Sequence, residues 1–236
     1  MYQPIVDLSD GSLKAVEALA RFSFEPKRSP DRWFQEAGEV GLLSQLECVA
    51  IEGAVSHIAS IPGSALLSVN VSPSTMIGPD FAKLIPRLPM ERLVLEITEH
   101  AYVEDYATLK RVLLDVNTRG GRVAVDDAGA GFASLRHIVQ MAPAVIKLDM
   151  SLVRGIDSDP ARRALVTGLC VFAKEVNATI VAEGIESPNE LRVLRALGVS
   201  HGQGYYLARP GGLPAPIRYP LAESEQQPMS TGGMHQ

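Results

Sequence analysis

Residues 144–183, AVIKLDMSLVRGIDSDPARRALVTGLCVFAKEVNATIVAE, contain the pattern that decides the fold. Two short apolar runs, Ala144–Asp149 and Ala178–Glu183, flank a longer segment of helical period, Pro160–Val176. The longer segment opens at an Asp-Pro pair, which is typical of a helix start. A strand, a helix and a second strand in this order predict a unit in which both strands run parallel.

The same alternation continues along the chain in both directions. Further helix-like segments include Leu43–Ile61, Asp105–Thr118 and Pro188–Leu197. The strand candidates are Gln3–Leu8, Val16–Phe22, Leu66–Ser72, Leu93–Thr98, Arg122–Asp127, Ala144–Asp149, Ala178–Glu183 and His201–Leu207. Eight strands over this length favour an α/β fold closed into a (β/α)8 barrel of the TIM type. Only a short turn separates the first two strands, so one early strand should run antiparallel.

Length and composition fit one globular α/β domain. The chain has 236 residues, of which 46% are hydrophobic and 21% are charged, and its formal net charge is -5. A strongly basic face is therefore excluded, and polymeric nucleic acid is not an expected partner. No run of about 18 apolar residues occurs, so no membrane span is expected. The start of the chain lacks the pattern of a signal peptide, which makes the cytoplasm the expected location.

Two further expectations concern the ends of the domain and its thiols. The barrel should occupy residues 1–220, and the polar tail Leu221–Gln236 should be disordered. Cys48 and Cys170 lie far apart in apolar, helix-like stretches. They show no zinc-binding spacing and are expected to be buried, reduced thiols.

Acidic and amide side chains stand at the ends of five of the apolar runs. These residues are Glu17, Asn70, Glu96, Asp126 with Asp127, and Glu183. A sixth run carries Lys147 inside the sequence VIKLD. In a barrel of parallel strands the carboxyl ends gather at one rim, and that rim holds the active site. We therefore expect these side chains to converge there, although they are distant in the sequence.

Side-chain alternation along the strands refines this expectation. In the second strand candidate, Glu17, Leu19 and Arg21 fall on one face. The adjacent Asp126 and Asp127 would point in opposite directions in a continuous strand. If both serve one site, the strand must break there, and the glycines that follow this pair would allow it.

A cluster of these residues has an electrostatic consequence. Four carboxylates and one amide, from Glu17, Asn70, Glu96, Asp126 and Asp127, would repel one another and raise one another's pKa. Hard divalent cations resolve this conflict, and ligation by oxygen alone selects Mg²⁺ or Mn²⁺ over zinc. Two such ions about 4 Å apart are a known arrangement for phosphodiester hydrolysis, and one carboxylate, Asp126, could bridge them.

Each residue also has a simpler interpretation when taken alone. One acid at a strand end is more often a helix cap or a solvated loop residue. Asn70 could start a turn, and Lys147 could extend from a strand edge to solvent. The glycines at 129 and 131 resemble a dinucleotide-binding loop that lacks its third glycine. These interpretations weaken together, because one rim would have to host all of them.

At these residues the sequence resembles the EAL-domain family. Glu17-Ala18-Leu19 matches the motif that gives the family its name. The further matching residues, in family order, are Gln3-Pro4-Ile5, Arg21, Asn70 with Ser72, Glu96-Ile97-Thr98-Glu99, Asp126-Asp127, Ser134-Leu135, Lys147-Leu148-Asp149, Ala182-Glu183-Gly184-Ile185-Glu186 and Gln203-Gly204-Tyr205. Any one triplet is a weak signal, whereas the ordered set is very specific.

The resemblance implies a barrel with an antiparallel first strand and hydrolysis of cyclic di-GMP to linear pGpG with two Mg²⁺ or Mn²⁺ ions. It implies that the metal ligands are Glu17, Asn70, Glu96, Asp126 and Asp127. Glu183 would be a general base or a further metal-shell carboxylate, and Lys147 would orient the attacking water. The substrate would contact Arg21, Leu19, Gln203 and Glu186, and Glu99 would brace the loop that carries the aspartate pair. A homodimer is also implied.

The sequence departs from the family pattern at a few positions. Ala128 and Ala130 stand where the family usually has Phe and Thr, which leaves open how this loop couples to dimerisation or regulation. Phe22 replaces a usual Trp, and Gly38 stands where the family often has Glu. The segment that usually precedes the first motif is missing. This suggests either a domain whose regulatory partners lie elsewhere in a larger protein or a naturally short form.

Two other functions remain open. An EAL-like barrel can sense cyclic di-GMP without cleaving it, although members of that kind typically lose metal ligands, and none is lost here. Metal-dependent barrels that abstract a proton beside a carboxylate also place acids at strand ends. Asn70 and the aspartate pair suit a phosphodiester site better than that reaction.

Overall fold

The computed structural model describes residues 1–98, 105–129, 138–213 and 217. Eight strands form one closed barrel in the order of the sequence. The strands are β1 (Tyr2–Asp7), β2 (Leu13–Ala18), β3 (Leu66–Asn70), β4 (Leu93–Thr98), β5 (Arg122–Ala128), β6 (Val145–Leu148), β7 (Thr179–Ala182) and β8 (His201–Gly202). The predicted α/β barrel is confirmed.

The first strand runs against both of its neighbours. β1 pairs antiparallel with β2 and with β8, whereas every pair from β2–β3 to β7–β8 is parallel. The turn between β1 and β2 is short, since β1 ends at Asp7 and β2 begins at Leu13. Within the turn, Asp7 accepts hydrogen bonds from the backbone N–H and the hydroxyl of Ser9 at 2.8 and 2.5 Å. The antiparallel first strand is therefore confirmed, and a hairpin is its cause.

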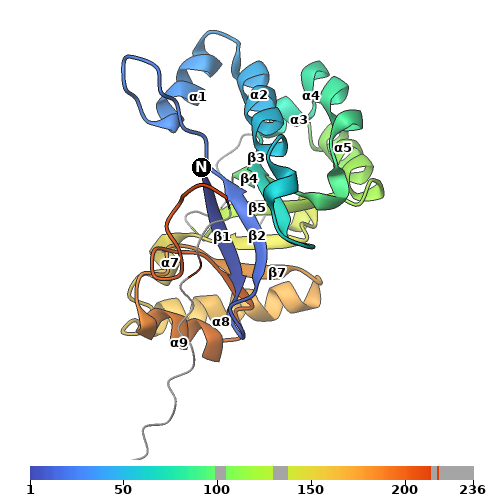
Figure 1. Cartoon of the computed structure of the whole chain (residues 1–236). Helices are drawn as coiled ribbons and strands as arrows, with labels where there is room; N and C mark the ends of the chain where they lie inside the picture. Colours follow the sequence, from blue (N-terminus) through green and yellow to red (C-terminus); the bar gives the residue numbers. More distant parts are fainter. Residues whose placement is uncertain (99–104, 130–137, 214–216, 218–236) are drawn as a thin grey trace, which may run out of the picture.

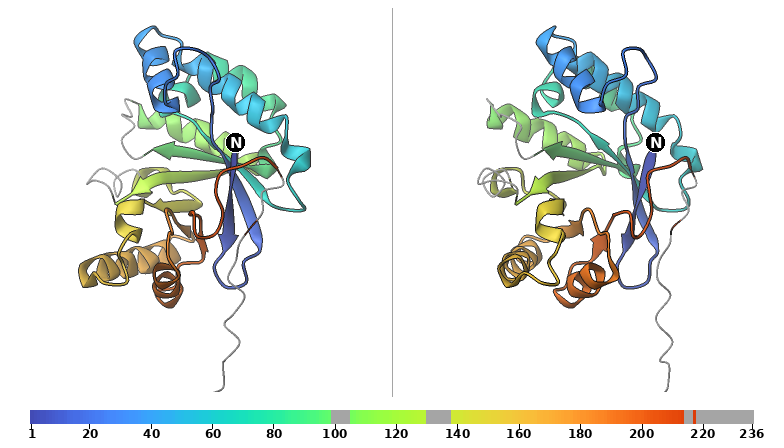
Figure 2. Two further views of the ribbon diagram at one scale, coloured as in Figure 1. Left: turned by 60° about the vertical axis from the view of Figure 1, so that its left-hand side comes forward. Right: turned by 90° about the vertical axis from the view of Figure 1, so that its left-hand side faces the viewer.

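Helices cover the outside of the barrel in two groups. In Figure 1, α1 to α5 lie above the strands, and α7 to α9 lie below them. The two turned views of Figure 2 show the same separation. The helices are α1 (Pro30–Glu39), α2 (Leu43–Val55), α3 (Pro73–Met76), α4 (Pro79–Leu84), α5 (Tyr106–Thr118), α7 (Met150–Val153), α8 (Pro160–Glu175) and α9 (Pro188–Ala196). Short 3-10 turns occupy Ile58–Ser60, Ile85–Arg87 and Met90–Arg92.

The helix starts follow the signals in the sequence. Asp159 accepts hydrogen bonds from Ala161 and Arg162 at the start of α8, and Ser187 accepts one from Glu190 at the start of α9. In each case proline occupies the first helical turn, where its missing N–H costs nothing. Among the described residues, no helix combines the length and the apolar character that crossing a bilayer requires.

The second strand ends earlier than its sequence pattern predicts. β2 stops at Ala18, so Leu19 and Arg21 do not continue the face of Glu17 along the strand, and that part of the expectation is wrong. The N–H of Leu19 still donates to the carbonyl of Met1, and the Met1 amino group donates to the carbonyl of Leu19, but the residues after Ala18 are not part of the strand.

The core has one apolar layer outside the barrel and one inside it. Between strands and helices, Leu67, Leu95 and Ile146 are fully buried. Inside the barrel, Ile5, Ala15 and Val181 form a smaller apolar group, and Leu66 and Val145 pack against it. Side chains two residues apart on a strand share a face. The residues two positions after this apolar group, such as Glu17 and Lys147, therefore also face the interior of the barrel, and they are polar.

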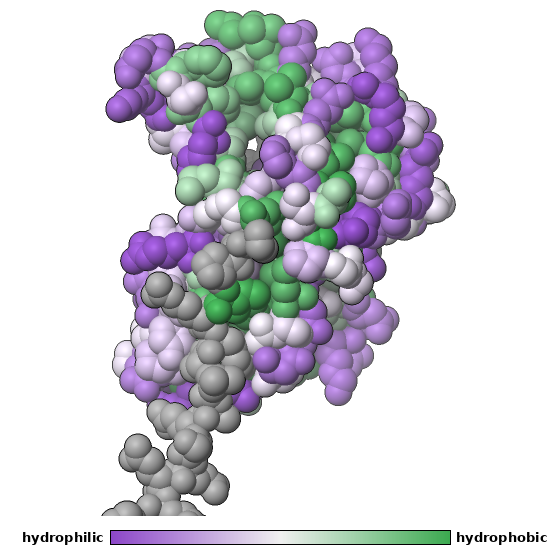
Figure 3. Space-filling model, viewed as in Figure 1, coloured by the Kyte–Doolittle hydropathy of each residue, from purple (hydrophilic) through white to green (hydrophobic). Residues whose placement is uncertain are grey.

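Apolar surface also remains exposed. Figure 3 shows it gathered over the upper helices, near α1 and α2. Val40 and Leu42 between these helices are 68% and 48% exposed, and Val49 on α2 is 62% exposed. Scattered exposed apolar side chains are normal on soluble proteins.

Candidate active site

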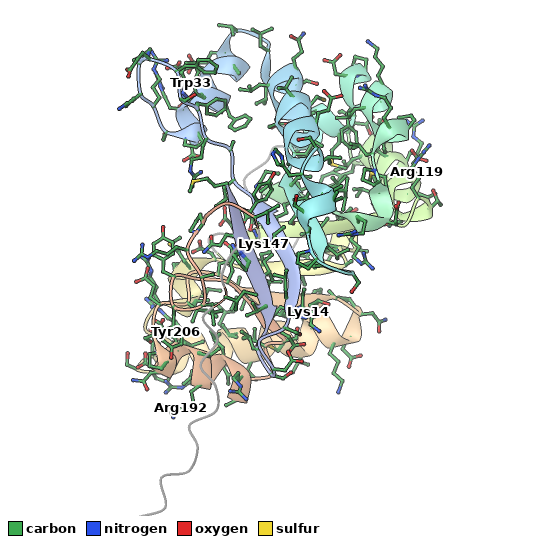
Figure 4. All side chains as sticks on the ribbon, in the orientation of Figure 1. Lys14, Trp33, Arg119, Lys147, Arg192 and Tyr206 are labelled. Carbon is green, nitrogen blue, oxygen red and sulfur yellow. The ribbon has the colours of Figure 1, made fainter. Side chains whose placement is uncertain are left out.

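A buried lysine lies at the centre of the polar layer. Figure 4 shows Lys147 in the middle of the molecule, between the two groups of helices. Its side chain is 1% exposed, and its ammonium nitrogen lies near one carboxylate from each of four segments. The distances are 2.7 Å to Glu183, 2.8 Å to Glu96, 3.1 Å to Asp126 and 3.5 Å to Glu17. These four acids come from the ends of β7, β4, β5 and β2.

Strand register explains how residues so distant in sequence meet. Ala15 and Val145 belong to the apolar layer inside the barrel, and Glu17 and Lys147 follow them by two residues on the same strands. Side chains at this spacing point to the same side of a sheet. The inward face of each strand therefore changes from apolar to polar within a single step, and the apolar layer seals one end of the polar cluster.

Neutral side chains link the carboxylates to one another. The amide nitrogen of Gln203 donates to Glu17 at 2.7 Å and to Glu183 at 3.0 Å. Asn70 donates to Glu17 at 3.5 Å. The amide oxygen of Gln203 is buried, and none of the residues that the structure describes donates a hydrogen bond to it.

Ser68 is a member of the cluster that the motif analysis did not assign. Its hydroxyl donates to Glu96 at 2.5 Å, and both residues are 1% exposed. The second oxygen of Glu96 accepts from Lys147, so both oxygens of this carboxylate have partners. Alternation could have indicated it, because Ser68 lies two residues before Asn70 on the same strand.

The aspartate pair converges through an unusual backbone conformation. Asp127 has a φ of 58°, in the left-handed region, and the pairing of β5 with β6 shifts register between Val125 and Ala128. Oxygens of Asp126, Asp127 and Glu183 consequently lie within 4.8 Å of one another. β5 continues to Ala128, so the expected break in the strand is absent, and the shift in register with the left-handed Asp127 brings the pair together instead.

Glycine at position 129 is required by the packing below this turn. Its φ is 103°, and a Cβ atom there would lie 2.3 Å from a methyl carbon of Leu152 on α7. A methyl group there would force the Leu152 side chain to shift, and the positive φ strains any residue other than glycine.

The remaining expected site residues lie around the cluster. Arg21 is exposed, and its guanidinium donates to the carbonyl of Ala20 at 2.7 Å. Glu186 forms an ion pair of 2.5 Å with Arg154. Leu19 is half-buried just beyond the end of β2. Glu99 and Ala130 lie outside the described residues.

Charges and burial shift the pKa values within the cluster in opposite directions. Burial tends to lower the pKa of Lys147, but four surrounding carboxylates outweigh it and raise that pKa well above its usual value. Burial raises the pKa of Glu96 well above its usual value, with Glu17 and Asp126 adding to the effect. Burial likewise raises the pKa of Glu183 to about 8. For Glu17, burial is outweighed by the charge of Lys147 and by hydrogen bonds, and its pKa is lowered.

These shifts describe a site with more negative charge than its one ammonium can balance. Without another cation, this excess favours the uptake of protons by Glu96 and Glu183. The donor atoms are carboxylate and amide oxygens, the set that hard divalent cations prefer. Divalent cations would replace those protons, so the residues present fit a metal centre.

Fold and site together define a class of protein: a closed α/β barrel whose strand ends surround a buried lysine with carboxylates. Residues 1–210 match the sequence model of the EAL domain family. The chain therefore belongs to the EAL domain family, as its motifs indicate.

Similar proteins agree with this membership. The chain is 30% identical over 221 residues to the cyclic di-GMP phosphodiesterase PA2567 of Pseudomonas aeruginosa, covering 89% of the chain and 38% of the relative. It is also 30% identical to an uncharacterized signaling protein of Caulobacter vibrioides, covering 91% of the chain and 27% of the relative. The chain thus spans well under half the length of these curated relatives.

Solved structures of similar fold include complexes with a ligand. A standalone EAL protein from Vibrio cholerae O395 in its c-di-GMP bound form is 28% identical, with a TM-score of 0.74 over 89% of the chain and 91% of that protein. BlrP1 of Klebsiella pneumoniae, as a manganese and cyclic di-GMP complex, is 26% identical, with a TM-score of 0.77 over 89% of the chain and 55% of that protein.

Proposed function

We propose that this chain is a metal-dependent phosphodiesterase that hydrolyses cyclic di-GMP to linear pGpG and so lowers the level of this second messenger. The convergence of four carboxylates on the Lys147 ammonium within 3.5 Å carries the proposal. The metal ligands would be Glu17, Asn70, Glu96, Asp126 and Asp127, and the ions Mg²⁺ or Mn²⁺. Divalent ions at such a site lower the pKa of water and stabilise charge on phosphoryl oxygens.

Side chains of the chain have the remaining roles in the proposed hydrolysis. Glu183 accepts a proton from the attacking water, and Gln203 holds this carboxylate in place through its amide nitrogen. Lys147 orients the water and favours its deprotonated form by its charge. Arg21 holds a phosphate oxygen. In-line attack of the water oxygen on phosphorus would then break the bond to the ribose 3′ oxygen, which takes up a proton and becomes the 3′ hydroxyl of the linear product.

One assay tests this function against pure sensing. Purified protein is incubated with cyclic di-GMP and Mg²⁺ or Mn²⁺, and chromatography follows the linear product. We expect product with either metal and none after a chelator is added. Binding without product would support the sensor instead, and neither binding nor product would support a different metal-dependent barrel.

Other expectations from the sequence remain predictions. These are the homodimer, the cytoplasmic location, the limits of the catalytic barrel at residues 1–220 with a disordered tail, and regulatory domains outside this chain. The expected contacts of Leu19, Gln203 and Glu186 with the substrate, and of Glu99 with the aspartate loop, belong to the same proposal.

A further inference from the structure

A buried carboxylate outside the metal cluster holds together two segments that lead to the site. Glu190 on α9 is 7% exposed and accepts three backbone N–H groups. One oxygen accepts from Gly155 at 3.0 Å, and the other accepts from Glu186 at 2.9 Å and from Ser187 at 3.0 Å. Gly155 follows α7, so one side chain joins the chain after β6 to the chain after β7.

We propose that Glu190 is a positioning residue that fixes the 183–187 loop, and with it Glu183 and Glu186, against the turn after α7. The inference rests on the proposed function, because the loop matters for catalysis only if its two glutamates do. Glu190 touches none of the reacting groups itself and would act entirely through the backbone that it binds.

Helix capping alone does not account for these contacts. Ser187 and Glu190 form a capping box, in which the Ser187 hydroxyl accepts from the Glu190 N–H and the Glu190 carboxylate accepts from the Ser187 N–H. The bond to Gly155 spans 35 residues and contributes nothing to the cap. The bond to Glu186 fixes the backbone of a residue that precedes the helix.

Close packing also restricts the 183–187 loop, so a shift at one residue of the loop would displace its neighbours. A Cβ atom at Gly184 would lie 2.7 Å from the Cβ of Met150 on α7. The N–H of Ile185 donates to the carbonyl of Gln203, and its carbonyl accepts from Tyr206. The loop therefore lies between α7 and the segment after β8, with Glu190 holding its end.

A second link joins the same segments, but it is weaker. The side chains of Arg154 and Glu186 form an ion pair and are 51% and 45% exposed. Exposed pairs of this kind contribute little, because solvent screens them. The buried carboxylate with three N–H donors is the stronger restraint, since each donor would otherwise lose its partner.

Three variants of the full chain separate positioning from capping. Glu190→Ala removes both the cap and the link to Gly155. Ser187→Ala is the matched control, because it weakens the cap and leaves the Glu190 carboxylate in place. Glu190→Gln keeps one acceptor oxygen, but its NH2 group cannot accept a hydrogen bond, so it can hold only one of the two segments and should have an intermediate effect. The readouts are the Mn²⁺ dissociation constant by calorimetry, the exchange rate of the Gly155 amide, and kcat and KM for cyclic di-GMP.

We expect Glu190→Ala to lower kcat and weaken Mn²⁺ binding by about tenfold relative to Ser187→Ala, with a smaller change in KM. Its Gly155 amide should exchange faster than in the control, and the values for Glu190→Gln should lie between those of the parent and of Glu190→Ala. If Glu190→Ala does not fold, Glu190→Asp replaces it, because the shorter side chain cannot span both segments.

Equal values for Glu190→Ala and Ser187→Ala would overturn the proposal, and so would an unchanged exchange rate of the Gly155 amide in Glu190→Ala. A parent chain that binds Mn²⁺ but makes no product would contradict the proposed hydrolysis alone, because metal affinity and amide exchange still measure positioning. A parent that binds no Mn²⁺ would overturn both.

Discussion

The ammonium of Lys147 lies 2.7 Å from a carboxylate oxygen of Glu183, and both groups stand in the layer directly above the apolar interior of the barrel. At this distance the lysine is both the counter-charge of the cluster and a hydrogen-bond donor to the proposed general base. A single side chain therefore couples the charge balance of the site to the position of its base.

Lys147→Ala should lose most turnover while still binding cyclic di-GMP. Removal of the ammonium leaves the attacking water without its orienting charge, and a loss of about 100-fold in kcat is expected. Binding, measured by calorimetry in Ca²⁺ to suppress turnover, should change far less. Lys83→Ala is the control, because Lys83 is 77% exposed on α4. If Lys147→Ala retains full turnover, its proposed role is wrong.

Mn²⁺ should raise the melting temperature of the parent chain. A ligand that binds only the folded state at 100 times its dissociation constant adds about 2.7 kcal/mol, which corresponds to a shift of roughly 5–10 °C for a chain of this size. Glu96→Gln should reduce the shift, because it removes a fully buried carboxylate from the site. Glu175→Gln, a change at an exposed position, should leave it intact. Identical shifts in both variants would contradict the proposed ligand set.

Gly129→Ala should destabilise the chain by about 2–3 kcal/mol, because the added methyl meets Leu152 and the backbone has a φ of 103°. Gly53→Ala on α2 is the matched control, since nothing lies within 4 Å of its Cβ position. In a helix interior the same change should stabilise by about 0.5–1 kcal/mol. Urea unfolding measures both variants, and a neutral Gly129→Ala would show that the turn can move away from α7.

Stability should fall in acid as Asp7 is protonated. Hydrogen bonds from Ser9, partly opposed by burial and aided by Lys14, lower the pKa of Asp7 to about 2, against 3.8 ordinarily. A lowered pKa stabilises the folded state above the ordinary value, and this contribution disappears as the pH falls from about 4 to about 2. With solvent screening it amounts to about 1 kcal/mol.

Asp7→Asn tests this contribution. Lys14 pairs with Asp7 at 3.3 Å, His201 lies 3.9 Å from it, and Asp10 interacts with it through charge; burial lowers the pKa of His201. The difference in unfolding free energy between pH 5 and pH 2.5 should be smaller in Asp7→Asn than in the parent. An unchanged difference would assign the acid sensitivity to other carboxylates.

The sequence alone determined the class of fold, and it predicted which acidic side chains would gather at one rim. Alternating apolar runs and helical segments predict a barrel, and a turn too short for a crossover predicts the antiparallel pairing of β1 with β2. The acids at strand ends could be named because period-two alternation and the common rim of parallel strands are local rules. Leu93–Thr98 was predicted with its observed limits.

Only the tertiary structure decided how these side chains are positioned and how their charges are balanced. The convergence of Asp126 and Asp127 depends on a left-handed φ at Asp127 that no local preference demands. The contacts of Ser68 with Glu96 and of Glu190 with Gly155 join residues 28 and 35 positions apart. Hydrogen bonds and charge interactions act across space at a few ångströms, so pKa values and partners follow from packing, which the order of residues along the chain does not contain.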